Sequence, residues 1–143
     1  MSSASKALLE TLSSVLKHGH IRNGFDHVLK DVKILSAVPG KVDFEMEVKH
    51  EHTNQGNILH GGLTSTLIDT LTTLALMSTE RQTPGVSVDL GINFLKAAKL
   101  GDKIKIETEV IKQGKTLAFT MAKILNQKGE IVALGNHVKH IGG

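Results

Sequence analysis

The chain of 143 residues contains no cysteine, no tryptophan and no tyrosine. Without a thiol, disulfides, thiolate zinc sites and cysteine nucleophiles are excluded. Aromatic residues make up only 3% of the chain and are all phenylalanine, so the stacking platforms of single-strand nucleic-acid binders are largely missing. The net charge of +3 is small for a nucleic-acid-binding protein but suits the binding of a small anionic ligand.

Long apolar runs are missing as well. No run approaches the roughly 18 residues that indicate a membrane span, and no signal peptide is expected. An amphipathic helix is predicted over Ser5–Leu16 as a cap on the domain, since Glu10 and the lack of arginine before Arg22 argue against a mitochondrial presequence. With 40% hydrophobic and 22% charged residues, the composition is that of one globular domain. We expect a cytoplasmic location, with mitochondrial association as the alternative.

A helical pattern that begins at Gly61 is the most informative stretch. Apolar residues recur at helical spacing, at Leu63, Leu67, Leu71 and Leu74. Between Gly61 and Thr79 the only full charge is Asp69. A helix so poor in charge is expected to be covered on most sides, so Asp69 is predicted to be screened from water. Such a carboxylate is either functional or bonded to neighbouring hydroxyls, and the helix alone leaves both readings open.

The motif His60-Gly61-Gly62 stands where this helix begins. First-turn N–H groups have no intrahelical partner, so both glycines are expected to present bare amides to an oxyanion. A plain loop-to-helix junction is the alternative. Asp69 lies eight residues beyond Gly61, roughly 12 Å along the axis. Two groups so far apart cannot meet one small substrate within a single helix, so a second subunit is expected to supply one of them.

Strand patterns flank the helix. A first strand is predicted over Val28–Val38, and Val42 to Val48 alternates apolar and polar residues as a half-buried antiparallel strand does. After a polar loop from His50 to Leu59 and the helix, four further strands are predicted over Val86–Phe94, Lys103–Lys112, Lys115–Asn126 and Glu130–His140. The pattern predicts an α+β fold, an antiparallel sheet of about six strands around one long helix. Residues 1–27, with a connector from His18 to Gly24, are expected to precede a domain of residues 28–143.

Two other kinds of site find little support. The eight histidines include the pairs His50-x-His52 and His137-x-x-His140, but a zinc site needs three or four ligands, and on a strand the second pair would point to opposite faces. No metal is therefore expected. The chain has no Gly-x-Ser-x-Gly nucleophile elbow, so a Ser-His-Asp hydrolase is not supported either.

Short stretches between Val38 and His140 resemble one family almost without a gap. They are VPGKV (38–42), EHTN (51–54), LHGGLT (59–64), TER (79–81), PGVSVD (84–89), AKLG (98–101), KQGKTLAFT (112–120) and HVKH (137–140). With the order of elements, they resemble the hotdog-fold acyl-CoA thioesterases. The resemblance implies a hotdog dimer, paired into a homotetramer, that hydrolyses medium- to long-chain fatty acyl-CoA without metal or organic cofactor. A lipid-transfer-type protein is a further expected partner.

The resemblance also implies catalytic roles. Gly61 matches a residue whose N–H, with the Asn54 side chain, polarises the thioester carbonyl. Asp69 matches the carboxylate that activates the attacking water or attacks directly, and Ser87 matches a hydroxyl that helps to place it. Two histidines complete the set: His60, expected to orient the Asn54 loop, and His137, a second histidine near the site.

A site for the CoA nucleotide is implied in the same way. Its contacts are His50, Ser87, Phe94, Leu95, Lys96, Ala97, Ala98, Lys99, Lys112, Gln113, Gly114, Lys115, Thr116, Leu117 and His140. Lys96-Ala97 departs from a more usual Ser-Pro and is expected to loosen the loop and add a cation. Lys99, Lys112 and Lys115 are expected to contact phosphates as point charges, whereas Lys103 and Lys105 are expected on solvated strand faces.

Two other functions stay open. One is hydration or dehydration of an enoyl thioester on the same fold, and the other is a non-enzymatic acyl-CoA-binding regulator that acts through a protein partner. The glycine pair and Asn54 favour hydrolysis over the first. Release of free thiol, rather than hydration of an enoyl-CoA, separates these two reactions, and turnover that is lost in Asp69→Ala excludes pure binding.

Overall fold

Helices at the start and middle of the chain alternate with two runs of strands. The computed structural model describes residues 2–18 and 24–142, so residues 19–23 of the expected connector lie outside the described residues. In chain order the elements are α1 (Ser3–His18), the 3-10 helix η1 (Phe25–Leu29), β1 (Lys33–Val38), β2 (Lys41–Glu47), the 3-10 helix η2 (His50–His52), α2 (Gly61–Met77), β3 (Val86–Phe94), β4 (Lys103–Gln113), β5 (Leu117–Leu125) and β6 (Ile131–His140).

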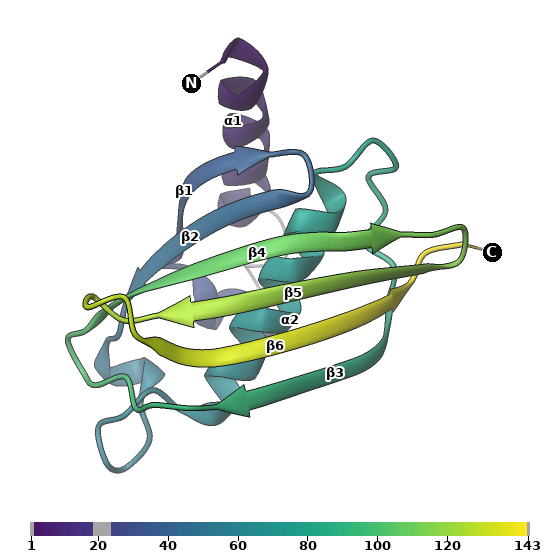
Figure 1. The fold of residues 1–143 in the computed structure, drawn as a ribbon. Helices are drawn as coiled ribbons and strands as arrows, with labels where there is room; N and C mark the ends of the chain where they lie inside the picture. The colour runs from purple at the N-terminus through teal and green to yellow at the C-terminus, as the bar shows by residue number, and fades with distance from the viewer. Residues whose placement is uncertain (1, 19–23, 143) are drawn as a thin grey trace.

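The strands form one antiparallel sheet in the order β1-β2-β4-β5-β6-β3. Helix α2 lies across one face of this sheet (Figure 1). Helix and sheet approach closely at β6, where a Cβ on Gly135 would lie 2.7 Å from Cγ2 of Ile68. Any side chain at this position would push the helix away, because packed interiors leave no room for an added group. The predicted α+β arrangement of a sheet around one helix is confirmed.

Strand β2 shows how the pattern places the core. Val42, Phe44 and Met46 are buried, and the residues between them are more exposed. On the other face the half-buried Asp43 lies 3.7 Å from the more exposed Lys105 amino group of β4. The period of two therefore directs one set of side chains onto α2 and the other to solvent, as predicted.

The first strand is shorter than predicted. It begins at Lys33, and the stretch that precedes it forms η1. Backbone bonds from the Lys30 N–H to the His27 carbonyl (3.1 Å) and from the Val32 N–H to the Leu29 carbonyl (3.0 Å) close tight turns there. The buried Leu29 side chain explains the curl, because an extended chain would not return this leucine to the core.

Strand β3 forms one edge of the sheet and pairs only with β6. The strand predicted over Val86–Phe94 is present, but its apolar side chains are largely exposed in the single chain, Val86 to 70% and Phe94 to 60%. A register shift between Ser87 and Asp89 also breaks the alternation. Only Ile92 of the apolar residues of β3 packs against the core, since α2 lies mainly across β4, β5 and β6 and reaches β3 only with its first turn (Figure 1).

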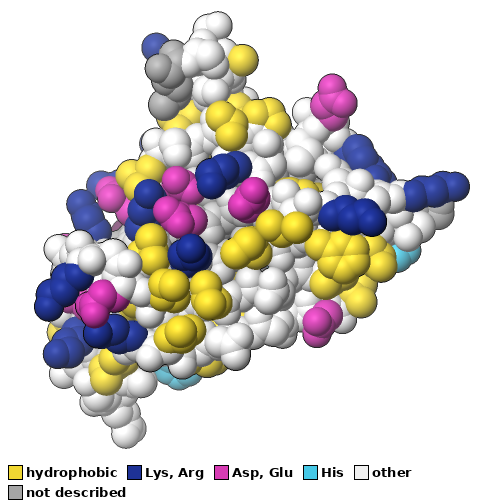
Figure 2. Space-filling model, in the orientation of Figure 1, with side chains coloured by type: hydrophobic (Ala, Val, Ile, Leu, Met, Phe, Trp, Pro, Cys, Tyr) yellow, Lys and Arg dark blue, Asp and Glu magenta, His cyan; other side chains and the backbone are white. Residues whose placement is uncertain are grey.

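Helix α1 packs beside the opposite edge, next to β1 (Figure 1). Its buried residues Leu12 and Leu16 belong to the main core, and Val15 packs against it. The sheet face turned away from α2 carries apolar side chains between charged ones (Figure 2), the exposed Phe119 among the apolar residues. A helix suited to crossing a membrane is absent from the described residues.

Candidate active site

The backbone amide of Gly61 is open at the start of α2. His60 precedes the helix in an extended conformation, and its Nδ1 accepts from the Gly62 N–H at 2.8 Å. The expectation of two bare amides is therefore wrong for Gly62, because the His60 side chain caps it. The N–H of Gly61 has no acceptor among the described residues. The Gly61 N–H thus stands as an open backbone donor at the positive end of the helix dipole.

The loop before the helix orients the amide of Asn54. Its Oδ1 accepts from the N–H groups of Gly56 at 2.9 Å and Ile58 at 3.3 Å. These two bonds distinguish the oxygen from the nitrogen, and they leave an NH₂ group with no acceptor within the described chain. The His60 N–H also donates to the His52 carbonyl at 2.9 Å and so ties the end of the loop to its start. Asn54 and Gly61 are therefore two free donors on one connected segment.

A cavity of about 310 Å³ adjoins the Gly61 amide. Its lining includes most of the predicted nucleotide segment that follows β3, namely Phe94, Leu95, Lys96, Ala97 and Ala98. The expected extra cation is paired, because Lys96 Nζ lies 2.7 Å from Glu130 Oε2. Lys99 is exposed, and its backbone N–H donates to Asp102. The predicted contact His50 lies nearby in sequence, exposed in η2.

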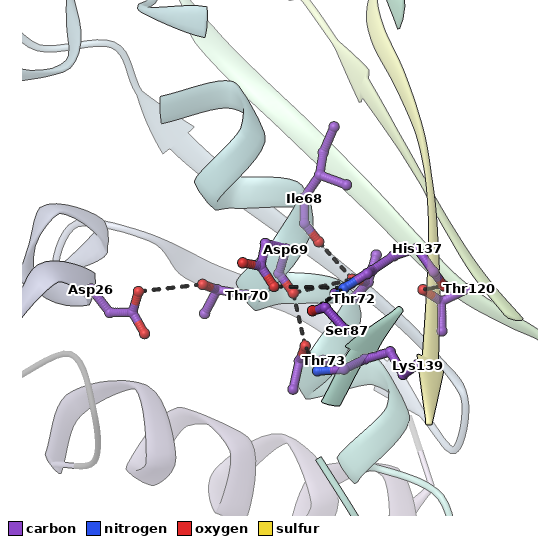
Figure 3. A network of polar contacts seen from close by, with 10 residues as sticks. All are labelled: Asp26, Ile68, Asp69, Thr70, Thr72, Thr73, Ser87, Thr120, His137 and Lys139. Atoms are coloured by element: carbon purple, nitrogen blue, oxygen red, sulfur yellow. Dashed lines mark hydrogen bonds and ion pairs between the residues drawn. The ribbon is translucent and has the colours of Figure 1, made fainter. Parts of the chain in front are cut away.

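Asp69 lies two turns further along α2 and faces β6 (Figure 3). Its side chain is 49% exposed, so the prediction of a carboxylate screened from water is wrong for the single chain. The charge-free surface around it is formed by threonines that donate to helix carbonyls, as Thr73 does to the Asp69 carbonyl at 2.8 Å. Asp69 Oδ1 lies 3.8 Å from Nε2 of His137, which leaves the carboxylate oxygens largely open.

His137 is fully buried between two hydroxyl groups (Figure 3). Its Nδ1 lies 2.8 Å from Thr72 Oγ1 and its Nε2 lies 2.7 Å from Ser87 Oγ. The Thr72 hydroxyl has one proton to donate, and it donates this proton to the Ile68 carbonyl at 2.6 Å. Nδ1–H of His137 must therefore donate to Thr72, and Nε2 accepts from the Ser87 hydroxyl. The lone pairs of Ser87 are then free for a further donor.

Burial lowers the pKa of His137, and the nearby Lys139 ammonium lowers it further, although Asp69 and Asp89 act in the opposite direction. The ring is thus neutral near pH 7, as the tautomer requires. Burial also lowers the pKa of Lys139, while the charge of Asp69 opposes that shift. Lys139 Nζ donates to Thr73 Oγ1 at 2.8 Å.

Sequence reasoning missed Thr72, Thr73 and Lys139 as members of this group. A signal existed for Lys139, because it stands two residues after His137 and so shares its face of β6. Thr72 and Thr73 were visible only as parts of a polar helix face. Nothing in the helical period indicates which threonine meets the histidine.

The other predicted nucleotide residues lie at the far end of the sheet. They belong to the hairpin between β4 and β5 or adjoin it, and they are Lys112, Gln113, Gly114, Lys115, Thr116, Leu117 and His140. Arg81 supports this hairpin, since its guanidinium donates to the carbonyls of Gly114 at 2.6 Å and Lys115 at 3.3 Å. Lys112 and Lys115 are exposed, and neither forms an ion pair within the described residues.

One chain therefore carries two half-sites. The donors Asn54 and Gly61 lie with the segment after β3, whereas Asp69, Ser87 and His137 form a separate group. The eight residues between Gly61 and Asp69 place these groups roughly 12 Å apart along α2. The two nucleotide segments likewise flank opposite ends of β3 (Figure 1).

One group of side chains has the composition of a metal site. Ligand atoms of Asp31, Glu51 and His52 lie within 4.8 Å of one another. Both carboxylates already face lysines, Glu51 at 2.7 Å from Lys30 and Asp31 at 3.4 Å from Lys49. Nδ1 of His52 accepts from the Lys49 N–H at 2.9 Å, so Nε2 carries the ring hydrogen and has no lone pair for a metal. The group is a poor cation site.

Comparison with known proteins defines the class. A family model described as Thioesterase superfamily matches residues 56–133, more than half of the chain. The chain belongs to the thioesterase superfamily, its fold is the hotdog fold, and it is a thioester hydrolase.

Individual relatives are similar over nearly the whole length. The chain is 48% identical to human acyl-coenzyme A thioesterase 13 over 143 residues, covering 99% of each protein. Thioesterase superfamily member 2 from zebra fish superposes with a TM-score of 0.91 at 47% identity, covering 94% of this chain and 98% of that one. A hypothetical thioesterase from Streptococcus pneumoniae TIGR4, solved with coenzyme A, has a TM-score of 0.75 at 30% identity and covers 80% and 90%.

Proposed function

We propose that this protein hydrolyses fatty acyl-CoA, of medium to long chain, to a fatty acid and CoA. The observation that carries the proposal is the pair of half-sites, with two free N–H donors on one segment and an open carboxylate beside a buried His–Ser pair on another. The similarity to acyl-coenzyme A thioesterase 13 and to a thioesterase solved with coenzyme A supports the choice of substrate.

The donors suit the oxygen of a thioester. In the proposed reaction the Gly61 N–H and the Asn54 amide bind the carbonyl oxygen, whose negative charge grows as the nucleophile adds to the carbon. Donors fixed in advance stabilise this oxyanion more than the ground state. Asn54 is fixed in this way by its bonds to Gly56 and Ile58.

The carboxylate half-site suits a water molecule. A water between Asp69 and Ser87 would donate one proton to the carboxylate and the other to the free lone pairs of Ser87, which leaves its own lone pair for the carbonyl carbon. His137 positions Ser87 by accepting its proton. Collapse of the adduct breaks the carbon–sulfur bond, the CoA sulfur leaves as thiol with the proton that Asp69 had taken from the water, and the fatty acid remains. Direct attack by Asp69, with an anhydride that water then cleaves, uses the same groups.

The distance between the half-sites supports a site that is built from two chains. Antiparallel α2 helices across a twofold axis place Gly61 of one chain beside Asp69 of the other, which forms two equal sites per dimer. The β3 edge supports this assembly, because an exposed apolar edge strand is a template for pairing with another chain. Pairing of two such dimers into a tetramer remains a prediction from the resemblance.

Edge pairing also unites the nucleotide residues. When two β3 strands pair antiparallel, the Phe94 end of one lies beside the Val86 end of the other. His140 of β6 pairs with Val86 on one side and with Leu117 on the other, so the Lys112–Leu117 hairpin lies at the Val86 end of β3. The segment Phe94–Lys99 of one chain then meets the lysine-bearing hairpin of its partner. One CoA would bridge both chains.

Complementation tests the proposal. Subunits with Asn54→Ala and Gly61→Pro are mixed with Asp69→Ala subunits under conditions that exchange partners, and thiol release from a panel of acyl-CoA is measured. Proline suits Gly61, because this residue opens the helix and His60 is already extended. Gly61→Ala is the matched control, since it keeps the N–H and its Cβ would lie 3.5 Å from the Phe94 ring.

Each parent is expected to be inactive and the mixture to regain one intact site per mixed dimer. Mixed dimers that form, by native mass spectrometry, but stay inactive would show that each site belongs to one chain. Wild type that hydrates an enoyl-CoA without releasing thiol would favour the hydratase. Wild type that binds acyl-CoA without turnover would favour the regulator.

A further inference from the structure

A second cavity, of about 270 Å³, opens beside Asp69 on the side away from the Gly61 segment. It runs between α1, η1 and α2 and reaches the end of β6. Its lining residues are Val15, Leu16, Asp26, Asp69, Thr70, Thr73, Leu74, Met77, Pro84 and Lys139. The volume lies slightly below the roughly 300–1,000 Å³ typical of small-molecule pockets.

Apart from the Asp69 carboxylate, which belongs to the half-site at one end of the cavity, the polar side chains that line it have partners. Thr70 donates to Asp26 at 3.5 Å, and Thr73 donates to the Asp69 carbonyl and accepts from Lys139 (Figure 3). Buried polar groups that are bonded to one another do not require polar atoms from a ligand. The remaining wall is apolar, formed by Val15, Leu16, Leu74, Met77 and Pro84. The cavity therefore suits an apolar occupant.

The axis of the cavity follows α2. Asp69, Thr73 and Met77 stand four residues apart on one face, so they cover roughly 12 Å of the helix. Asp69 lies at the end that belongs to the half-site, and Met77 is the last residue of the helix. A chain that leaves the reacting carbonyl at Asp69 would extend along this face toward Met77.

We propose that this cavity holds the acyl chain of the substrate and that α1 limits the length of the chain. The proposal rests on the proposed function, which supplies the acyl group. Val15 and Leu16 form the wall opposite α2, in the same chain as the Asp69 that activates the nucleophile. The N-terminal helix is thus a specificity element. One chain binds the acyl group, and the other chain supplies both oxyanion donors, Asn54 and Gly61.

The test measures binding, so that it does not depend on turnover. S-alkyl-CoA thioethers of increasing chain length, which cannot be hydrolysed, are titrated calorimetrically into wild type, Val15→Phe and Ser14→Phe. Val15 is half-buried and lines the cavity, whereas its neighbour Ser14 is exposed and does not, so Ser14→Phe is the matched control. Met77→Ala enlarges the end of the cavity that lies away from Asp69, so it should lengthen the chain that the cavity accepts, whereas Val15→Phe should shorten it.

In wild type and Ser14→Phe, each methylene that enters the cavity is expected to tighten binding about fourfold, up to a limiting length. Val15→Phe should reach this limit at a shorter chain, with the affinity for S-methyl-CoA unchanged, and Met77→Ala should extend it. The proposal is overturned if Val15→Phe gives the same length profile as Ser14→Phe, or if it weakens binding equally at every length. Failure of the proposed function is a separate result, since it would appear as wild type that binds the thioethers but releases no thiol from acyl-CoA.

Discussion

The hydroxyl of Thr72 offers the sharpest test of the site, because a single proton decides the tautomer of His137. Thr72→Val keeps the shape of the side chain and removes the acceptor of Nδ1–H, which lies 2.8 Å away in a fully buried position. A buried donor left without a partner costs about 1–3 kcal/mol. For a chain of this size that corresponds to a fall in Tm of roughly 4–12 °C.

The ring can avoid this cost only by moving its proton to Nε2. Ser87 would then accept from His137 and turn its own proton outward, toward the place where we expect water to donate. Loss of one such hydrogen bond, about 1–1.5 kcal/mol, corresponds to roughly a tenfold fall in kcat. Either outcome is visible, the first in thermal unfolding and the second in the ¹⁵N shifts of the imidazole ring.

Thr66→Val is the matched control. Thr66 lies on the same helix, and its hydroxyl donates only to the Gly62 carbonyl at 2.8 Å. If Thr72→Val matches this control in Tm, kcat and the His137 ring shifts, the assigned tautomer and the positioning role of His137 are wrong.

Three further predictions concern the donors, the lysines and pH. Asn54→Ala should lower kcat on the order of 10²-fold with a smaller change in KM, because its amide acts on the developing oxyanion; a raised KM at normal kcat would contradict this. Lys112→Ala and Lys115→Ala should raise KM, more strongly at low salt, whereas the exposed Lys33→Ala on the opposite edge should not; equal effects of all three would place the nucleotide elsewhere. Folding lowers the pKa of His137 below its usual 6.5. As pH falls, the unfolded chain therefore binds this proton before the folded chain does. The stability that the neutral His137 contributes is complete above pH 6.5 and is lost as pH falls below 6.5. The free energy of unfolding, measured with urea between pH 5 and 7.5, should fall less steeply toward low pH in His137→Gln than in wild type. Parallel curves for the two proteins would refute the lowered pKa of His137.

Local patterns in the sequence were sufficient for most of the fold. The leucine spacing of α2 and the alternation in β2 follow from the periods of helix and strand, which are properties of neighbouring residues. The position of Asp69 on α2, eight residues from Gly61, already implied that one helix cannot hold the complete site. The family motifs indicated a thioesterase before any contact was known.

Only the tertiary structure decided which groups meet. Thr72 and His137 are 65 residues apart, and Ser87 and His137 are 50 apart, so no local pattern could pair them. The capping of Gly62 by His60, the pairing of Lys96 with Glu130 and the cavity under α1 depend on side-chain directions that a period does not specify. The exposure of β3 is also a tertiary result, because alternation records that one face of a strand is covered and not whether the cover comes from the same chain. Burial and partnership are properties of the folded assembly, whereas periodicity is a property of the chain.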